Sequence, residues 1–481
     1  MLNIDLQVIM LDRKQAQEAK AVLEDFTSQL AMVRATVTDL ERRIVDMTNT
    51  LAPVSSIPSE ILATIFKELG ASDGYLRYET RTPRSKLPSI MLASHVNRRF
   101  RHVAVGTPSL WTGVHIHLSS DMDIYLMEAY LERSQSCGLD IHVVNYTHTP
   151  EGIYQVFGRL VSHCGRWKTL SVESESSFCM RRIISGLQSL CVPQLESIQI
   201  ALSGSIPDGT PISSTDSDVH IFRGGAPALA SIELRNVSLL CCFPPLNALR
   251  TLDNQTFSRH THLLSYDQFH HISMTTPFLT KLRLSNLLFS PDIGNELVPI
   301  DLLSLRTLTL VMQMDPSKED GGPLIDVFKA LRIPCLQTLE IKSATTAQTS
   351  SVLKFLQAEA RLRYPALQSL ALRDINCSNC ITLDLIHALP NITSLSLIHA
   401  AEDIVLKILT DKEVFVSQMW PQLRTLEVAV VDLDLLREFI SVRESRIDSL
   451  TLARARGSPE IPPDCYEWLK AHVRFVNISA L

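Results

Sequence analysis

The chain has 481 residues, which corresponds to about three domains of ordinary size. Its 45 lysines and arginines against 51 aspartates and glutamates leave a formal net charge of −6, and hydrophobic residues make up 45%. These values exclude a polycationic protein and a disordered acidic one, and the 17 glycines are too few for glycine-rich nucleotide loops.

The N-terminal segment has no basic residues ahead of its apolar stretch, and no run of about 20 apolar residues occurs anywhere. We therefore expect no signal peptide, no membrane span, and a cytoplasmic or nuclear location. The 10 cysteines are too sparse for a disulfide scaffold, and Cys377-x-x-Cys380 has no second pair at zinc-binding spacing. We expect no metal and no cofactor.

Residues 16–51 carry apolar side chains at alternating spacings of three and four, with no glycine or proline before Pro53. This period predicts a coiled coil within an N-terminal helical domain of residues 1–52. A long amphipathic helix packed on the rest of the protein is the alternative. The few flanking charges indicate neither the partner nor its direction, and a homodimer is one option. The predicted seam comprises Leu23, Phe26, Leu30, Val33, Val37, Leu40, Ile44, Met47 and Leu51.

Three short motifs follow the coil. Residues 57–66 read IPSEILATIF, in which Pro58 and Ser59 suit the first turn of a helix and an apolar stripe runs from Ile61 to Leu69. Polar residues at 70–88 predict an inserted loop. Residues 92–104 (LASHVNRRFRHVA) predict a second apolar helix with a basic turn, and residues 107–111 read TPSLW.

This order of motifs resembles the F-box, in the divergent form found behind an N-terminal coil in large families of mushroom-forming fungi. The chain departs from the family pattern with Ile57 for leucine, Asn97 for cysteine and Phe100 for tryptophan. The resemblance implies that residues 53–118 form a helical domain that docks on the Skp-type adaptor of a cullin–RING ubiquitin ligase. The docking residues that it implies are Ile57, Pro58, Ile61, Leu62, Ile65, Phe66, Leu92, Val96, Phe100, Leu110 and Trp111.

A segment this small buries little apolar surface alone, so its stripe requires a partner or a neighbouring domain. Helices that only cap the following domain are the alternative to adaptor docking. We expect Leu62→Asp to abolish adaptor binding and to leave the protein soluble. Basic residues also gather here, but without interleaved aromatics they favour a solvated loop and a basic helix turn over nucleic-acid binding. They are Arg77, Arg81, Arg84, Lys86, Arg98, Arg99 and Arg101.

The motif P-x-Φ-x-x-Φ-x-Φ, in which Φ is apolar, recurs from Pro193 to Pro421, and forms without the proline begin at Trp167, Leu305 and Ile447. The first apolar positions are 167, 195, 229, 246, 279, 305, 336, 367, 392, 423 and 447, with a degenerate unit near Leu246. Helix-like stretches lie between them at 324–331, 352–362 and 433–440. This period is typical of the longer leucine-rich repeats.

We therefore predict that residues 119–481 form an α/β, leucine-rich-repeat-like solenoid with parallel strands inside and helices outside. A doubly wound α/β sheet is the alternative, but its longer apolar strands and phosphate-binding turn are missing. Because side chains alternate along a strand, the polar residue of Φ-x-Φ is expected on the concave face. A mixed-charge face there suits a protein target, and its candidate residues are Gln199, Glu233, Arg235, Arg283, Thr309, Glu340, Lys342, Arg373, Ser396, Glu427 and Thr451.

Nucleotide-binding, serine-hydrolase and zinc-protease motifs are missing from the sequence, so we expect no enzyme. The leading hypothesis is a substrate-recognition adaptor of an SCF-type ligase, linked through the Skp-type adaptor to a cullin and holding an unknown protein target near the ubiquitin donor. The alternative is a non-ligase scaffold or sensor that self-associates through its coil. Neither hypothesis includes nucleic acid or a membrane.

Overall fold

A computed structural model describes residues 2–51, 53–78, 88–118, 121–145, 151–203, 219–255, 266–285, 299–312, 322–375, 381–400, 402–410, 419–429, 432–443, 447–454 and 461–480. The chain divides into two compact units, Met1–Trp111 and Thr112–Leu481. We describe each unit by itself.

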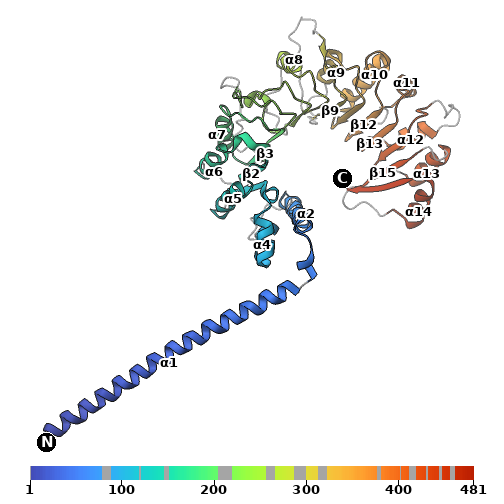
Figure 1. The fold of residues 1–481 in the computed structure, drawn as a ribbon. Helices are drawn as coiled ribbons and strands as arrows, with labels where there is room; N and C mark the ends of the chain where they lie inside the picture. Colours follow the sequence, from blue (N-terminus) through green and yellow to red (C-terminus); the bar gives the residue numbers. More distant parts are fainter. Residues whose placement is uncertain are drawn as a thin grey trace. The chain divides into compact units, whose positions relative to one another are not determined.

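The first unit begins with one uninterrupted helix, α1 (Leu2–Leu51), which Figure 1 shows in blue. Its length follows from the absence of proline and glycine over all 50 residues. The helix starts well before the predicted seam. All nine predicted seam residues are exposed, from 47% at Val37 to 83% at Leu51.

Short helices complete the first unit. They are the 3-10 turn η1 (Pro53–Ser56), α2 (Ser59–Tyr78), α3 (Ser89–Val96), α4 (Arg98–Val105) and the 3-10 turn η2 (Pro108–Trp111). The loop predicted from residue 70 is wrong for its first part, because α2 continues to Tyr78 with no proline to stop it before Pro83. Arg81, Arg84 and Lys86 lie outside the described residues.

Asn97 separates α3 from α4. Its backbone is extended (φ −156°), and its side-chain Oδ1 accepts a hydrogen bond from the Phe100 amide at 2.8 Å, so it caps the N-terminus of α4. Asparagine is among the best residues for this role, because its short side chain reaches an otherwise unpaired helix amide. The departure from the family's cysteine therefore has a local structural use.

Large apolar side chains form the core of the first unit. Leu62, Phe66 and Trp111 are at most 2% exposed, and the rings of Phe66 and Phe100 meet edge to face with centroids 5.3 Å apart. The Trp111 indole Nε1 donates to the Ala104 carbonyl oxygen at 2.7 Å, which satisfies its buried polar group. These two contacts join α2, α4 and η2.

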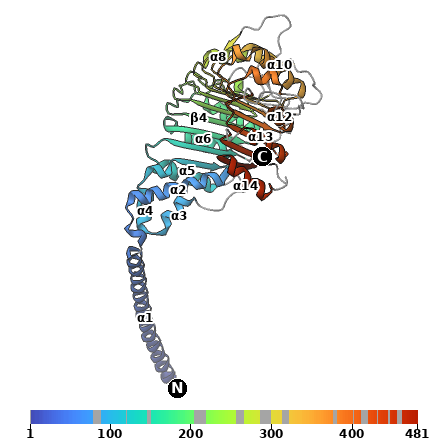
Figure 2. The ribbon, with the colours of Figure 1, turned by 90° about the vertical axis from the view of Figure 1, so that its right-hand side faces the viewer.

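The described residues of the second unit form a 14-stranded parallel sheet whose strand order follows the chain. Figure 2 shows the strands side by side. The strands are β1 (Gly113–His117), β2 (Leu139–Asn145), β3 (Trp167–Ser174), β4 (Ser197–Leu202), β5 (Ser231–Arg235), β6 (Thr251–Gln255), β7 (Lys281–Ser285), β9 (Thr307–Val311), β11 (Thr338–Lys342), β12 (Ser369–Arg373), β13 (Ser394–Ile398), β14 (Thr425–Val428), β15 (Ser449–Arg454) and β16 (Phe475–Ala480). A separate two-stranded sheet pairs β8 (Ile300–Asp301) with β10 (Leu331–Arg332).

Helices connect successive strands and lie on one side of the sheet (Figure 1). They are α5 (Asp121–Arg133), α6 (Glu151–Val161), α7 (Ser177–Leu187), α8 (Tyr266–Thr275), α9 (Gly322–Ala330), α10 (Thr346–Arg363), α11 (Leu383–Ala388), α12 (Glu402–Thr410), α13 (Leu433–Val442) and α14 (Pro463–His472), with 3-10 turns η3 (Cys164–Arg166) and η4 (Leu239–Cys241). The three predicted helical stretches are confirmed as α9, α10 and α13.

In the units that contain it, the recurring proline occupies a β-turn that leads into the following strand. In the unit before β4, the Leu195 amide donates to the Val192 carbonyl at 3.2 Å, which places Pro193 at the second turn position. The Leu336 and Leu423 amides make the same bond to Ile333 and Trp420. Proline favours this position because its ring fixes the required φ. The two apolar residues of Φ-x-Φ then fill buried columns, such as Leu339 and Ile341 of β11.

Several strands end in a residue with left-handed backbone. Asn236, Ser343, Asp374 and His399 have φ between 52° and 55°, and each directly follows a strand. The Ser343 amide donates to the Arg373 carbonyl at 2.9 Å, and the Asp374 amide donates to the Ile398 carbonyl at 2.7 Å. The turn thus adds one more rung to the ladder between neighbouring strands.

The structure corrects the predicted units in three places. The strands β1, β2 and β16 lack the proline motif and were not predicted, and β1 pairs with β2, so the sheet starts before the predicted boundary at residue 119. The degenerate unit starts at Leu249 and not Leu246, because Leu246 supplies the turn carbonyl that the Leu249 amide contacts at 3.0 Å.

Two predictions made from composition concern membrane-spanning helices and the Cys377-x-x-Cys380 pair. None of the described helices is long and apolar enough to cross a membrane. Cys377 and Cys380 lie outside the described residues.

Candidate binding face of the sheet

The side of the sheet opposite the helices carries three columns of polar side chains, because equivalent residues of neighbouring strands from β3 to β15 are register partners. The middle column contains Gln199, Glu233, Asp253, Arg283, Thr309, Glu340, Ser396, Glu427 and Thr451. The column toward the strand ends contains Arg235, Lys342 and Arg373. All the predicted face residues thus lie on one face, which the alternation along each strand predicts.

A third column was not predicted. The residue two positions before the middle column is serine or threonine in nearly every repeat: Thr169, Ser197, Ser231, Thr251, Thr307, Thr338, Ser369, Ser394, Thr425 and Ser449, with Lys281 as the exception. The sequence signal for this column was the serine or threonine that directly precedes the second Φ of the repeat motif. β-Branched and hydroxyl side chains suit a half-buried pleated surface, and here they form a hydroxyl stripe that Lys281 interrupts on β7.

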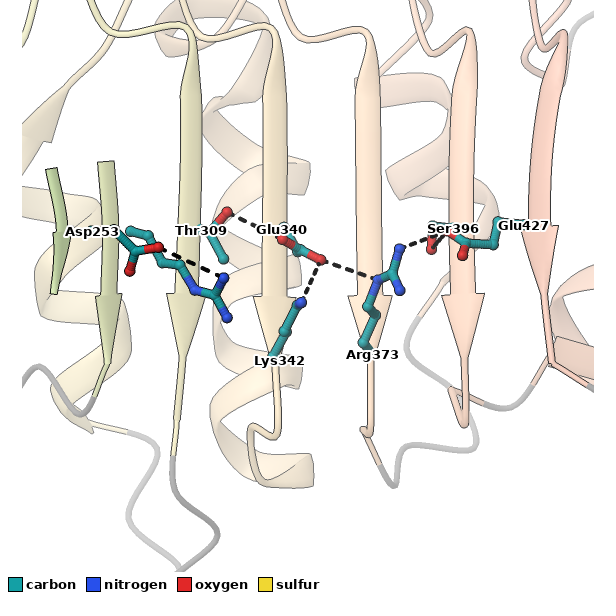
Figure 3. A network of polar contacts seen from close by, with 8 residues as sticks. Asp253, Thr309, Glu340, Lys342, Arg373, Ser396 and Glu427 are labelled. Carbon is teal, nitrogen blue, oxygen red and sulfur yellow. Dashed lines mark hydrogen bonds and ion pairs between the residues drawn. The ribbon is translucent and has the colours of Figure 1, made fainter. Parts of the chain in front are cut away.

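Glu340 on β11 is the centre of the main polar network (Figure 3). Its carboxylate accepts from the Thr309 hydroxyl at 3.1 Å, and its Oε1 lies 3.1 Å from both Lys342 Nζ and Arg373 Nε. The side chain is 19% exposed, so these cations compensate a carboxylate that is mostly removed from water.

Arg373 extends this network across two further strands. Its Nη2 lies 2.6 Å from Glu427 Oε2 on β14, and the same oxygen accepts from the Ser396 hydroxyl at 2.7 Å. The long reach is sterically open because Ala371 occupies the middle column on β12, where larger side chains stand on the neighbouring strands. One arginine thus joins carboxylates on β11 and β14.

A second network lies on β5 to β7. Arg235 pairs with Glu233 on its own strand (2.6 Å), and Asp253 accepts from the Gln255 amide at 3.0 Å and lies 3.9 Å from Arg283. Burial raises the pKa of the Asp253 carboxyl above its ordinary value, and the Gln255 hydrogen bond and the Arg283 charge partly offset that effect. The face therefore presents acids and bases that already neutralise each other.

The N-terminal end of the face carries histidines. His115 on β1 and His142 on β2 are register partners, with ring centroids 5.9 Å apart. Burial, with a smaller effect from His117, lowers the pKa of His142 to about 4. Among the described residues, no group of three or more His, Cys, Asp or Glu side chains could hold a metal ion.

The residues implied for adaptor docking divide into two sets. Leu62, Phe66, Leu110 and Trp111 are buried, and Ile57 and Phe100 are half-buried. Ile61, Ile65, Leu92 and Val96 are 42% to 62% exposed, and Pro58 is also exposed. Since Leu62 is a core residue, Leu62→Asp would disturb the helical unit itself, so the expectation that this variant stays soluble does not agree with its burial.

The basic turn of α4 makes local contacts. Arg98 lies 3.3 Å from Asp46 of α1, Arg99 donates to the Ile57 carbonyl, and the Arg101 Nε donates to the Ser94 carbonyl at 3.1 Å. These contacts give the three arginines a role in holding the helices together.

No known family model matches the chain, and no curated protein is significantly similar to it.

Proposed function

We propose that the protein is the substrate-recognition subunit of an SCF-type cullin–RING ubiquitin ligase. In this proposal the helices at 57–111 are a divergent F-box that docks on a Skp-type adaptor, and the sheet is the inner wall of a leucine-rich-repeat solenoid that binds a protein target. The observation that carries it is the division of the F-box-like apolar residues into a buried core and an exposed set.

The exposed set has no structural use that we can identify inside the first unit. Leu62 and Phe66 already supply the apolar contacts of α2, whereas Ile61 and Ile65 on the same helix keep about half of their surface in water. Exposed aliphatic side chains that recur on two helices of a small unit are typical of a protein-binding surface. A Skp-type adaptor is the partner that the motif order implies.

The polar face supports the second half of the proposal. Parallel strands with a rigid hydrogen-bonded ladder hold the three polar columns at fixed spacing, and the paired charges need little reorganisation to contact a protein. Charge pairs of this kind contribute specificity more than affinity. The mixed signs favour a polar protein surface over a polyanion.

Affinity purification of the full chain tests the adaptor contact. Wild-type protein should recover the Skp-type adaptor and the cullin, and Ile61→Asp combined with Ile65→Asp should lower that recovery at least about tenfold, because two charges would face an apolar partner surface. Lys67→Asp is the matched control, since Lys67 is an exposed residue of the same helix. Circular dichroism should show the same helix content for all three proteins.

Two results would contradict the proposal. The first is a wild-type chain that recovers neither adaptor nor cullin, which would favour the non-ligase scaffold. The second is an unchanged recovery of the adaptor by the Ile61→Asp and Ile65→Asp double variant.

A screen for targets compares wild type with a variant that carries Arg235→Glu and Lys342→Glu. Proteins that bind wild type and not this variant, while the adaptor is retained, are candidates for ubiquitination.

A further inference from the structure

The exposed seam of α1 is the largest apolar feature that the function above leaves unused. From residue 15 to residue 48 every described side chain is exposed apart from half-buried Asp46, and the seam carries leucine, isoleucine, valine, methionine and phenylalanine. A helix with this much exposed apolar surface is incomplete as a monomer. The inference below does not depend on the ligase proposal.

We infer that α1 pairs with α1 of a second copy of this chain, as an antiparallel coiled coil in which Ala19 lies against Ile44. The evidence is the match between the two halves of the seam. In an antiparallel pair, an a residue of one helix lies beside a d residue of the other. The resulting layers are Ala16 with Met47, Ala19 with Ile44, Leu23 with Leu40, Phe26 with Val37, and Leu30 with Val33.

These layers have similar volumes. Each of the two alanines meets one of the large residues near the other end of the helix, and the phenylalanine meets a smaller valine. A parallel, in-register pair would instead place Ala16 on Ala16 and Ala19 on Ala19, which leaves gaps, and would force Phe26 against Phe26. Both defects are costly in a close-packed interface.

Charge selects the same arrangement. Lys20 and Glu41 occupy e positions that face each other twice in this antiparallel register. Lys20 lies 3.9 Å from Glu24 within its own helix, so the second copy would add a further carboxylate. In the parallel pair Lys20 would face Gln15 and Glu41 would face Thr36, with no ion pair. Shifting the antiparallel pair by one heptad toward Leu51 would place Arg34 against Arg34.

Disulfide cross-linking of the full chain tests direction and register together, because no cysteine occurs before Cys137. We expect Ala19→Cys and Ile44→Cys, co-expressed and oxidised, to form a disulfide-linked dimer only when both are present. In the antiparallel pair Ala19 of one copy lies about 38 Å along the axis from Ala19 of the other, beyond disulfide reach. Wild-type protein gives the background from the native cysteines.

Two further variants test the interface without cysteine. Leu30→Glu should convert the dimer to monomer in light scattering after size exclusion, and Met32→Glu should not, because Met32 is also exposed but lies off the seam. Lys20→Glu should weaken the dimer about tenfold, and adding Glu41→Lys should restore it.

Three results would overturn the inference. A wild-type monomer at the highest concentration reached would exclude the second copy as the partner. A disulfide formed by either single-cysteine variant alone would show a parallel pair, and a trimer or larger assembly would exclude the two-helix arrangement. Recovery of the Skp-type adaptor by the Leu30→Glu monomer would show that adaptor binding does not depend on dimerisation through α1.

Discussion

Arg373 Nη2 and Glu427 Oε2 lie 2.6 Å apart although β13 separates their strands. Arg373 also faces Glu340 on β11, so removing it would leave two mostly buried carboxylates with fewer cationic partners. We expect Arg373→Met to lower the free energy of unfolding by about 1–2 kcal/mol, less than for a fully buried pair because the side chains keep some exposure.

Urea unfolding measures this effect. The control is Arg235→Met, which removes an exposed arginine paired with Glu233 and should cost no more than about 0.5 kcal/mol. Equal losses for the two variants would mean that the bridge across β13 contributes nothing special.

Asn254 interrupts an otherwise aliphatic column. Leu234 and Leu284 flank it on β5 and β7, and its buried side-chain oxygen has no hydrogen-bond partner among the residues that the structure describes. We expect Asn254→Leu to raise the free energy of unfolding by about 1–2 kcal/mol, because it replaces an unsatisfied polar group with core packing. The opposite change, Leu284→Asn, should lower it by at least about 2 kcal/mol. A destabilised Asn254→Leu in thermal unfolding would show that the amide has an unrecognised role.

His142 should make the protein acid-sensitive. Its pKa is about 4 in the folded state and 6.5 in the unfolded chain, so the unfolded state takes up the proton first as the pH falls. Above pH 6.5, His142 does not change the free energy of unfolding. Between pH 6.5 and pH 4, protonation of this histidine in the unfolded chain lowers the free energy of unfolding by up to about 3 kcal/mol. We expect His142→Gln to reduce this loss. Urea unfolding of both proteins at the two ends of this window provides the comparison, and parallel pH profiles would refute the assignment.

Ser343 has a left-handed backbone with φ 54°. A β-branched side chain is strained there, so Ser343→Val should destabilise the protein by about 1–2 kcal/mol, whereas Ser343→Gly should stabilise it by about 0.5 kcal/mol. Thermal melts of the two variants should therefore shift in opposite directions. A valine variant as stable as wild type would indicate that this turn changes conformation freely.

The repeat motif, with its proline in seven units and without it in four, located 11 of the 14 strands because its turn, its two buried columns and its polar face are all local properties. The strands β1, β2 and β16 have alternating apolar residues but no turn signal, so the period alone did not separate them from loops. Eleven residues of the face were predicted individually, but Asp253, the column of serines and threonines and the polar networks were not. The contact of Arg373 with Glu427 crosses β13, a relation that appears only when the strands are placed side by side.

The buried face of a helix was likewise not predictable from the sequence. An apolar stripe with neighbours such as Ile61 and Leu62 does not reveal which of the two faces the core, because both fit an amphipathic helix. The packing of α3 and α4 against α2 decides it. Asn97 shows the converse case, since a residue that weakened the motif match is explained by the cap that it forms.

The agreement between strand order and chain order has an evolutionary consequence. Each long-sheet strand pairs only with its neighbours in sequence, apart from the steps from β7 to β9 and from β9 to β11, where β8 and β10 belong to the separate two-stranded sheet. Duplication or loss of one complete unit would therefore lengthen or shorten the polar face without breaking the hydrogen bonds on either side of the change. Recombination between units can therefore change the set of polar residues on this face, while the residues that fold each unit remain as they are.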